Sequence, residues 1–203
     1  AGKSTLLNTL TAANVLEEDK LFATLDPTTR NYKLPNGQEV LLTDTVGFIR
    51  KLPHHLIDAF RSTLEEAKYS DIIIHVVDCS NPSMDKNVHA VYETLKNLEV
   101  KDKIIITVFN KIDKVEEKPV LRDFNADYTV SAAIKKNIGL NEINDAIEVA
   151  LKSMRVMVEK VYDYSEAGKI GIIRKYGQVL SEEYKEDGIH LKAYVPSQIM
   201  DRI

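Results

Sequence analysis

Two short apolar segments constrain the fold of this chain more than any other feature of its sequence. Residues 72–77 read Ile-Ile-Ile-His-Val-Val, and residues 104–109 read Ile-Ile-Ile-Thr-Val-Phe. Runs of this length and composition are typical of strands that are buried on both faces of a parallel sheet. A chain with two such strands needs other elements to cover both faces of that sheet.

Apolar residues at helical spacing predict the covering elements. This spacing occurs in four segments, which are residues 3–13, 56–67, 88–98 and 143–151. A further short strand is expected at residues 128–130. Strands that alternate with helices predict an α/β fold, here a doubly wound, mostly parallel sheet with helices on both faces.

An antiparallel hairpin is predicted near the start of the chain. Asn36-Gly37 separates strand-like residues 31–34 from residues 39–43, and Asn-Gly in this position is a strong hairpin signal. The polar stretch that precedes the hairpin, through Arg30, is expected to be a long loop.

The pattern changes near Met154. Beyond it we predict a strand, a helix weakened by two glycines, and a hairpin across Asp187-Gly188. These elements are residues 156–162, 166–175, 179–184 and 189–195. The sequence therefore predicts a first domain of residues 1–153 and a small α+β domain of residues 154–203.

Composition excludes several classes of protein. The net charge of the 203 residues is −4, which argues against a broadly basic surface that coats nucleic acid. The single cysteine, Cys79, excludes an internal disulfide and any multi-cysteine metal site. No apolar run approaches the roughly 18 residues of a membrane span. We expect a cytoplasmic protein and keep peripheral association with a membrane open.

The first residues indicate phosphate binding. Gly2, Lys3, Ser4 and Thr5 precede a predicted helix, like the end of the pattern G-x-x-x-x-G-K-[ST]. In that pattern backbone N–H groups surround phosphate oxygens, the Lys reaches the terminal phosphates, and the hydroxyl binds Mg²⁺. A capped helix start is the alternative interpretation. Because the motif is cut, we expect a piece of a longer protein whose first strand and loop start precede Ala1.

A second phosphate-site candidate follows the predicted hairpin. Asp44 stands at the end of its second strand, where a carboxylate can hold Mg²⁺ through water. Gly47, three residues later, lets its N–H approach a terminal phosphate without a side-chain clash. An ordinary turn is the alternative interpretation of this spacing.

Four residues, Asn-Lys-Ile-Asp, close the second apolar strand and can recognise a base. The Asp113 carboxylate can accept two hydrogen bonds from guanine, a donor pair that adenine lacks on that edge. Asn110 can tie loops together, and the stem of Lys111 can lie over the base plane. Ser131 and Ala132 end the next strand, where a backbone N–H can meet the guanine oxygen. Ligands of open α/β sheets bind at this edge, so all the candidates are predicted to meet there.

In this order and spacing, the segments resemble the guanine-nucleotide-binding domain of translation-type P-loop GTPases. Longer strings resemble, more narrowly, the HflX-type ribosome-binding GTPases. These strings are residues 21–30 (LFATLDPTTR), 44–50 (DTVGFIR), 52–54 (LPH) and 59–66 (AFRSTLEE). The resemblance covers nearly the whole chain, including the small C-terminal part.

The resemblance implies a role for each candidate, with GTP or GDP and Mg²⁺ as ligands. The implied catalytic residues are Lys3, Thr24 and Gly47, and the implied Mg²⁺ ligands are Ser4, Thr24 and Asp44. Thr28 and Thr29 are rivals of Thr24. The residues implied to contact the base are Asn110, Lys111, Asp113, Ser131 and Ala132. Ala133 departs from the family, which often has a Lys at this position.

The resemblance also implies a GTP-hydrolysing switch that associates with the large ribosomal subunit and promotes dissociation or rescue of ribosomes. Phe48 stands where many GTPases place a water-orienting Gln, so slow intrinsic hydrolysis is expected. Alternatives are a nucleotide-gated binding module with negligible hydrolysis, an ATPase, and a fragment that binds nothing. Lys169, Arg174 and Lys175 could contact RNA, although a solvated helix face is the preferred interpretation. His75 is expected to be a core residue with its hydrogen bonds satisfied.

Overall fold

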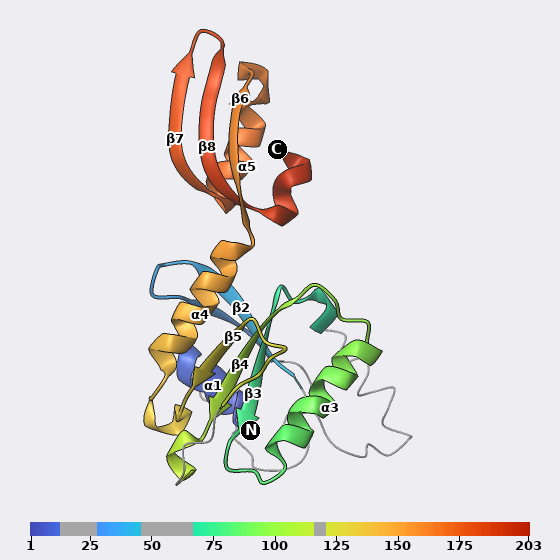
Figure 1. The fold of residues 1–203 in the computed structure, drawn as a ribbon. Helices are drawn as coiled ribbons and strands as arrows, with labels where there is room; N and C mark the ends of the chain where they lie inside the picture. The colour runs from blue at the N-terminus through green and yellow to red at the C-terminus, as the bar shows by residue number, and fades with distance from the viewer. Residues whose placement is uncertain (13–27, 46–66, 116–120) are drawn as a thin grey trace. The chain divides into compact units, whose positions relative to one another are not determined.

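The structure is a computed structural model that describes residues 1–12, 28–45, 67–115 and 121–203. These residues divide into two compact units, Ala1–Glu148 and Val149–Ile203 (Figure 1). The division falls inside helix α4 (Leu140–Ser153), whereas the sequence predicted a boundary after residue 153. Nearly all of the helix predicted at residues 56–67 lies outside the described residues.

A three-stranded parallel sheet forms the centre of the first unit. The two apolar runs of the sequence form its strands β3 and β4, which confirms the sequence-based prediction, and β5 completes the sheet in the order β3-β4-β5. The register pairs Asp78 with Asn110 and Phe109 with Ser131. The polar residues that end all three strands therefore lie at one edge. The strands are β3 (Ile72–Asp78), β4 (Ile104–Asn110) and β5 (Tyr128–Ser131).

Helices cover both faces of this sheet, as predicted. Figure 1 shows α3 (Met84–Asn97) on one side and α1 (Lys3–Thr11) with α4 on the other. Each helix buries apolar residues at helical spacing, and the strands supply the rest of the core. These residues are Leu6, Leu7, Val91, Leu95, Ile143 and Ile147 from the helices, and Val76, Ile106, Val108 and Phe109 from the strands. The α/β fold class is confirmed.

The predicted hairpin forms a separate two-stranded antiparallel sheet of β1 (Thr28–Lys33) and β2 (Glu39–Asp44). Its turn contains Gly37, whose φ of 88° favours glycine. The strand begins at Thr28, so the prediction of a loop through Arg30 is wrong for its last three residues. The reason is cross-strand pairing, because Thr28 and Thr29 lie opposite Asp44 and Thr43 and β-branched threonines suit a strand.

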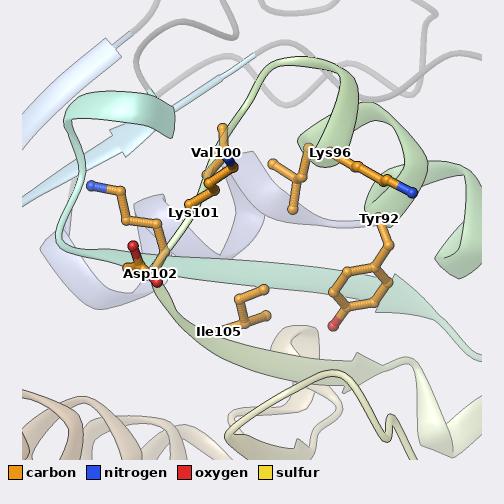
Figure 2. A pocket seen from close by; sticks show the side chains of 8 residues that line it. Tyr92, Lys96, Val100, Lys101, Asp102 and Ile105 are labelled. Atoms are coloured by element: carbon orange, nitrogen blue, oxygen red, sulfur yellow. The ribbon is translucent and has the colours of Figure 1, made fainter.

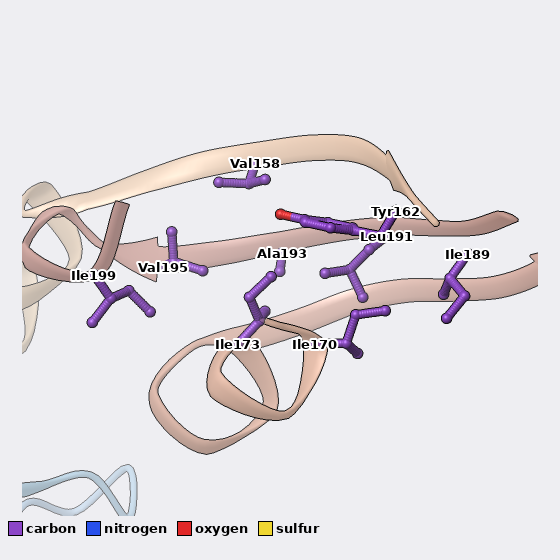
Figure 3. Packing of buried hydrophobic residues seen from close by; sticks show 9 residues of the cluster. All are labelled: Val158, Tyr162, Ile170, Ile173, Ile189, Leu191, Ala193, Val195 and Ile199. Carbon is purple, nitrogen blue, oxygen red and sulfur yellow. The ribbon is translucent and has the colours of Figure 1, made fainter. Parts of the chain in front are cut away.

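The second unit is a three-stranded antiparallel sheet with order β6-β8-β7 and a helix packed on one face (Figure 3). The predicted strand, helix and hairpin are all present. A capping box starts the helical segment: Asp163 accepts a hydrogen bond from the Ser165 N–H, and Glu166 accepts one from the Asp163 N–H. The elements are β6 (Arg155–Tyr162), η4 (Tyr164–Glu166), α5 (Ala167–Tyr176), β7 (Gln178–Lys185), β8 (Gly188–Pro196) and η5 (Ser197–Arg202).

None of the helices in the described part of the chain is both long and apolar enough to span a bilayer.

His75 is buried in β3, but the expectation that its hydrogen bonds are satisfied is wrong. Its Nδ1 atom has no hydrogen-bond partner among the described residues, and Asp123 Oδ2 lies 4.0 Å away. That carboxylate accepts hydrogen bonds from the Tyr92 and Thr107 hydroxyls instead, each at 2.7 Å. Burial lowers the pKa of His75 to about 4, against the opposing effect of Asp123. His75 is therefore neutral in the folded protein.

We expect this neutral His75 to make stability depend on pH. The unfolded chain takes up a proton near pH 6.5 and the folded protein does so near pH 4. The contribution is fully present above pH 6.5 and is lost as the pH falls towards 4, by roughly 3 kcal/mol. Denaturant unfolding at several pH values measures it. His75→Leu should remove this part of the pH dependence, and an unchanged dependence in the variant would contradict the assignment.

A second prediction concerns Tyr162, whose ring lies in the core of the second unit (Figure 3). Its side chain is 0% exposed, and its hydroxyl has no hydrogen-bond partner among the described residues. Tyr162→Phe should therefore raise the free energy of unfolding by about 1 kcal/mol, because an unpaired buried hydroxyl is costly. The matched control is Tyr184→Phe, which removes a hydroxyl that donates to Glu182 and accepts from Arg174. Urea unfolding followed by circular dichroism should show opposite signs for the two variants.

Candidate functional site

The start of α1 approaches the end of β4 so closely that only glycine fits at position 2. Gly2 precedes the helix with φ 101°, in the region that favours glycine. A Cβ atom at this position would lie 2.5 Å from Asn110 Nδ2. Both the backbone conformation and the contact therefore require Gly2. Lys3, Ser4 and Thr5 follow in the first turn of the helix.

Asn110 joins three segments at the carboxyl edge of the parallel sheet. Its side-chain amide donates to the Ala1 carbonyl at 2.9 Å, and its Oδ1 accepts from the Ile134 N–H at 3.1 Å. Its backbone carbonyl accepts from the Cys79 N–H at 3.0 Å. Asn110 is 4% exposed; its bond to the Ile134 N–H is buried, and its bond to the Ala1 carbonyl is partly buried. One side chain thus fixes the chain before α1 to the loop after β5.

Ser4 and Asp44 bring α1 to the end of β2. The Ser4 hydroxyl donates to Asp44 Oδ2 at 2.5 Å, and the Asp44 carboxyl group is buried. A hydroxyl and a carboxylate are the hard oxygen ligands that Mg²⁺ prefers, together with water and phosphate oxygens. This pair therefore fits a magnesium ion chemically.

Only two of the three candidates for the third Mg²⁺ ligand, Thr28 and Thr29, lie among the described residues. Thr24 lies outside the described residues, as do Gly47 and Phe48. Of its rivals, Thr28 stands opposite Asp44 in the hairpin, and the Thr29 hydroxyl is hydrogen-bonded to that of Thr43 at 2.9 Å.

Asp113 lies just beyond β4, in the short helix η2 (Ile112–Lys114). Its Oδ2 pairs with Lys136 Nζ at 3.1 Å, from the end of η3 (Ile134–Lys136). The hydrogen bond from this ammonium holds the pKa of Asp113 below its usual range. The carboxyl group is therefore ionised at neutral pH and can only accept hydrogen bonds, as recognition of guanine requires.

Ser131 ends β5, and Ala132 follows it beside η2. The Ala132 N–H donates to the Phe109 carbonyl at 2.8 Å, and the Ala132 carbonyl accepts from the Ile112 N–H at 3.2 Å. These bonds hold the loop after β5 against the loop after β4. The Ala132 N–H is thus engaged within the protein rather than directed at a ligand.

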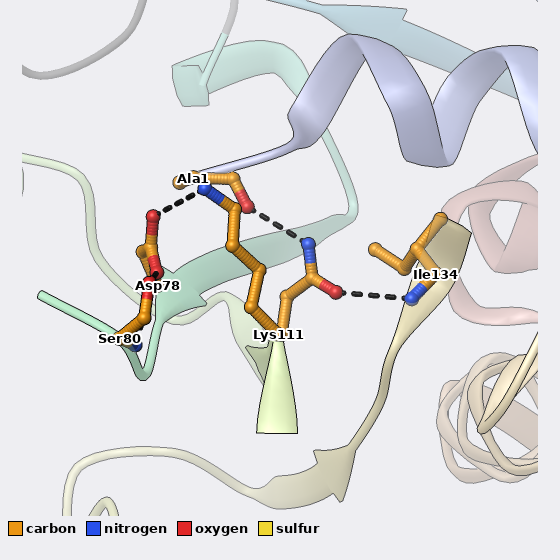
Figure 4. Close-up of polar contacts among 6 residues, drawn as sticks. Ala1, Asp78, Ser80, Lys111 and Ile134 are labelled. Atoms are coloured by element: carbon orange, nitrogen blue, oxygen red, sulfur yellow. Dashed lines mark hydrogen bonds and ion pairs between the residues drawn. The ribbon is translucent and has the colours of Figure 1, made fainter. Parts of the chain in front are cut away.

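Sequence reasoning missed two charged partners at this edge, Lys136 and Asp78. Lys111, which we expected over the base, places its Nζ 2.6 Å from Asp78 Oδ2 (Figure 4). A signal for Asp78 was present, since a carboxylate ends the first apolar run just as Asn110 ends the second. The signal for Lys136, the partner of Asp113, was weaker. Lys136 follows three residues after Ala133, the position at which the family often has a Lys.

A separate pocket lies at the opposite end of β4, between that strand and the last turns of α3 (Figure 2). Tyr92, Lys96, Val100 and Ile105 are among its lining residues. Strand β4 ends at Asn110, so the whole length of the strand separates this pocket from the predicted site. The pocket does not contain any of the predicted site residues.

Comparison with known proteins identifies the family of the chain. A family model described as 50S ribosome-binding GTPase matches residues 1–111. The chain is 64% identical over 199 residues to GTPase HflX of Lacrimispora saccharolytica, which covers 98% of this chain and 47% of that protein. It is 46% identical over 203 residues to GTPase HflX of Caldanaerobacter subterraneus, covering 100% of this chain and 46% of the relative. The chain thus spans about half the length of these relatives.

Solved structures show the same fold. A GTP-binding protein from Sulfolobus solfataricus in complex with GDP is similar with a TM-score of 0.62 at 28% identity. The match covers 73% of this chain and 48% of that protein. The family model, the relatives and the fold agree with the resemblance that the sequence motifs indicated. The chain therefore belongs to the family of 50S ribosome-binding GTPases and is a member of its HflX type.

Proposed function

We propose that this chain binds GTP and GDP with Mg²⁺, hydrolyses GTP, and acts as a switch on the large ribosomal subunit. The observation that carries the proposal is the meeting of residues 1–4 with both Asn110 and Asp44. The Asn110 amide holds the Ala1 carbonyl at 2.9 Å, and Ser4 contacts Asp44 at 2.5 Å. The phosphate-binding, Mg²⁺-binding and base-reading candidates are thereby joined at one end of the first unit.

The base would be read by Asp113. An ionised carboxylate accepts hydrogen bonds from both guanine N1–H and its exocyclic amine, whereas adenine presents no such pair. Lys111 would lie over the base, and the segment of Ser131 and Ala132 would border it. The GDP bound to the Sulfolobus solfataricus neighbour supports a guanine nucleotide for this fold.

The phosphates would lie at the start of α1. Backbone N–H groups at a helix start favour anions, and Gly2 leaves room for close approach. Lys3 would neutralise charge on the terminal phosphates, while Ser4, Asp44 and Thr24 would hold Mg²⁺, which supplies further charge stabilisation when bound. Hydrolysis would then proceed by in-line attack of water on the γ-phosphate.

Switching would depend on the segments of Thr24 and Gly47, which the γ-phosphate would order and hydrolysis would release. Phe48 cannot hydrogen-bond the attacking water, so a partner must supply part of the catalysis. The family description names 50S ribosome binding, which makes the large ribosomal subunit the proposed partner. The switch would promote dissociation or rescue of ribosomes. A nucleotide-gated binding module with negligible hydrolysis is the second candidate, and Phe48 is the residue that favours it.

Asp113→Asn tests the reading of the base. Replacing an acceptor by an amide should weaken GDP binding by at least tenfold and strengthen binding of xanthosine diphosphate, whose base accepts where guanine donates. Competition binding in the full-length protein measures both affinities. Glu93→Gln, at an exposed carboxylate on α3, is the control and should change neither. Equal loss for both nucleotides would contradict recognition of guanine.

Steady-state GTP hydrolysis by the full-length protein, with and without purified large ribosomal subunits, tests the switch. We expect slow turnover alone and at least a tenfold increase with the subunit, because Phe48 leaves the attacking water unoriented. Small subunits at equal concentration are the control. Binding of GTP without turnover under either condition would favour the binding-module alternative.

A further inference from the structure

We infer that Asp78 is a positioning residue for base recognition, which acts by anchoring the ammonium group of Lys111. The anchor would hold the Lys111 stem over the base and keep its charge away from Asp113. The inference rests on the proposed function, because it deepens the account of the same base-binding edge.

The register of the sheet brings the two residues together. Asp78 ends β3 directly opposite Asn110, which ends β4, so Lys111 leaves its strand beside Asp78. Lys111 adopts φ 65°, which is rare for a residue with a side chain. Its Nζ donates to Asp78 Oδ2 at 2.6 Å, and both side chains are largely shielded from water, at 29% and 19% exposed (Figure 4). A charge-assisted bond in this setting is stronger than one on the open surface.

The Asp78 carboxylate is itself held in place. Its Oδ1 accepts from the Ser80 N–H at 3.0 Å and from the Ser80 hydroxyl at 2.6 Å. One oxygen thus binds the turn after β3, and the other is left for Lys111. Burial raises the pKa of Asp78, but the bonds from Lys111 and Ser80 outweigh this effect and hold it below the usual range. The anchor is therefore charged at neutral pH.

An anchor matters because Lys111 has a second carboxylate close by in the sequence with which it could pair. Asp113 stands two residues further along and already carries Lys136 on its Oδ2 at 3.1 Å. A lysine side chain is long and loses considerable entropy when it is held in one geometry. Without Asp78, the Lys111 ammonium is free to pair with the Asp113 carboxylate, and guanine would have to compete with it for those acceptors. The stem would also leave the base plane.

A double-mutant cycle on Asp78 and Lys111 in the full-length protein tests the inference. Asp78→Asn should weaken GDP binding roughly tenfold, as expected for loss of one charge-assisted bond. Ser80→Ala should have a smaller effect in the same direction, and Glu93→Gln should have none. In a Lys111→Met background, Asp78→Asn should change GDP affinity less than twofold, because there is no ammonium left to position. Thermal unfolding of each variant establishes that it is folded.

Two results would overturn the inference. One is unchanged GDP affinity in Asp78→Asn. The other is full additivity of the two substitutions, which would show that Asp78 acts on the fold rather than through Lys111. The Asp113→Asn experiment separates these failures from failure of the proposed function. If that variant shifts preference to xanthosine diphosphate while Asp78→Asn has no effect, only the role of Asp78 is wrong.

Discussion

The buried side chain of Asn110 is the contact on which the candidate site depends. It contacts the Ala1 carbonyl and the Ile134 N–H at once, and the second of these bonds is buried. Loss of this amide would remove the buried acceptor of the Ile134 N–H, at a cost of about 1–3 kcal/mol. The same contact links the chain just before α1 to the segment after β5, so the residues proposed to bind phosphate are held against those proposed to read the base.

Two ion pairs lie at this edge of the sheet, and they differ in how far their side chains are exposed to water. Asp78 holds Lys111, and Lys136 faces Asp113. The first pair is shielded and anchored by Ser80, whereas the second is exposed, with Lys136 at 60%. An exposed ion pair contributes little and exchanges readily with water or a ligand. The two carboxylates are similarly exposed, at 19% for Asp78 and 22% for Asp113, so the difference between the pairs lies mainly in their lysines.

The second unit has a different organisation. Its core is formed by alternating residues of β6 and β8 and by one face of α5, and it includes the Tyr162 hydroxyl, which has no hydrogen-bond partner in the described part of the chain. Helix α5 forms despite Gly168 and Gly171, because the capping box at Asp163 and the burial of Ile170 and Ile173 compensate for their low helix propensity. Sequence alone indicated this helix, but it could not show what stabilises it.

The sequence by itself determined the elements whose signal is local. The apolar runs that became β3 and β4, the Asn-Gly and Asp-Gly turns, and the helical spacing of α3 and α4 are properties of a few consecutive residues, so they could be read without a structure. The family was readable for the same reason, since its motifs are contiguous strings. Only the tertiary structure decided the start of β1 at Thr28, the unsatisfied Nδ1 of His75, and the partners Asp78 and Lys136. Each of these depends on strand register or on groups far apart in the chain, and no local pattern encodes which side chains a sheet brings to one edge.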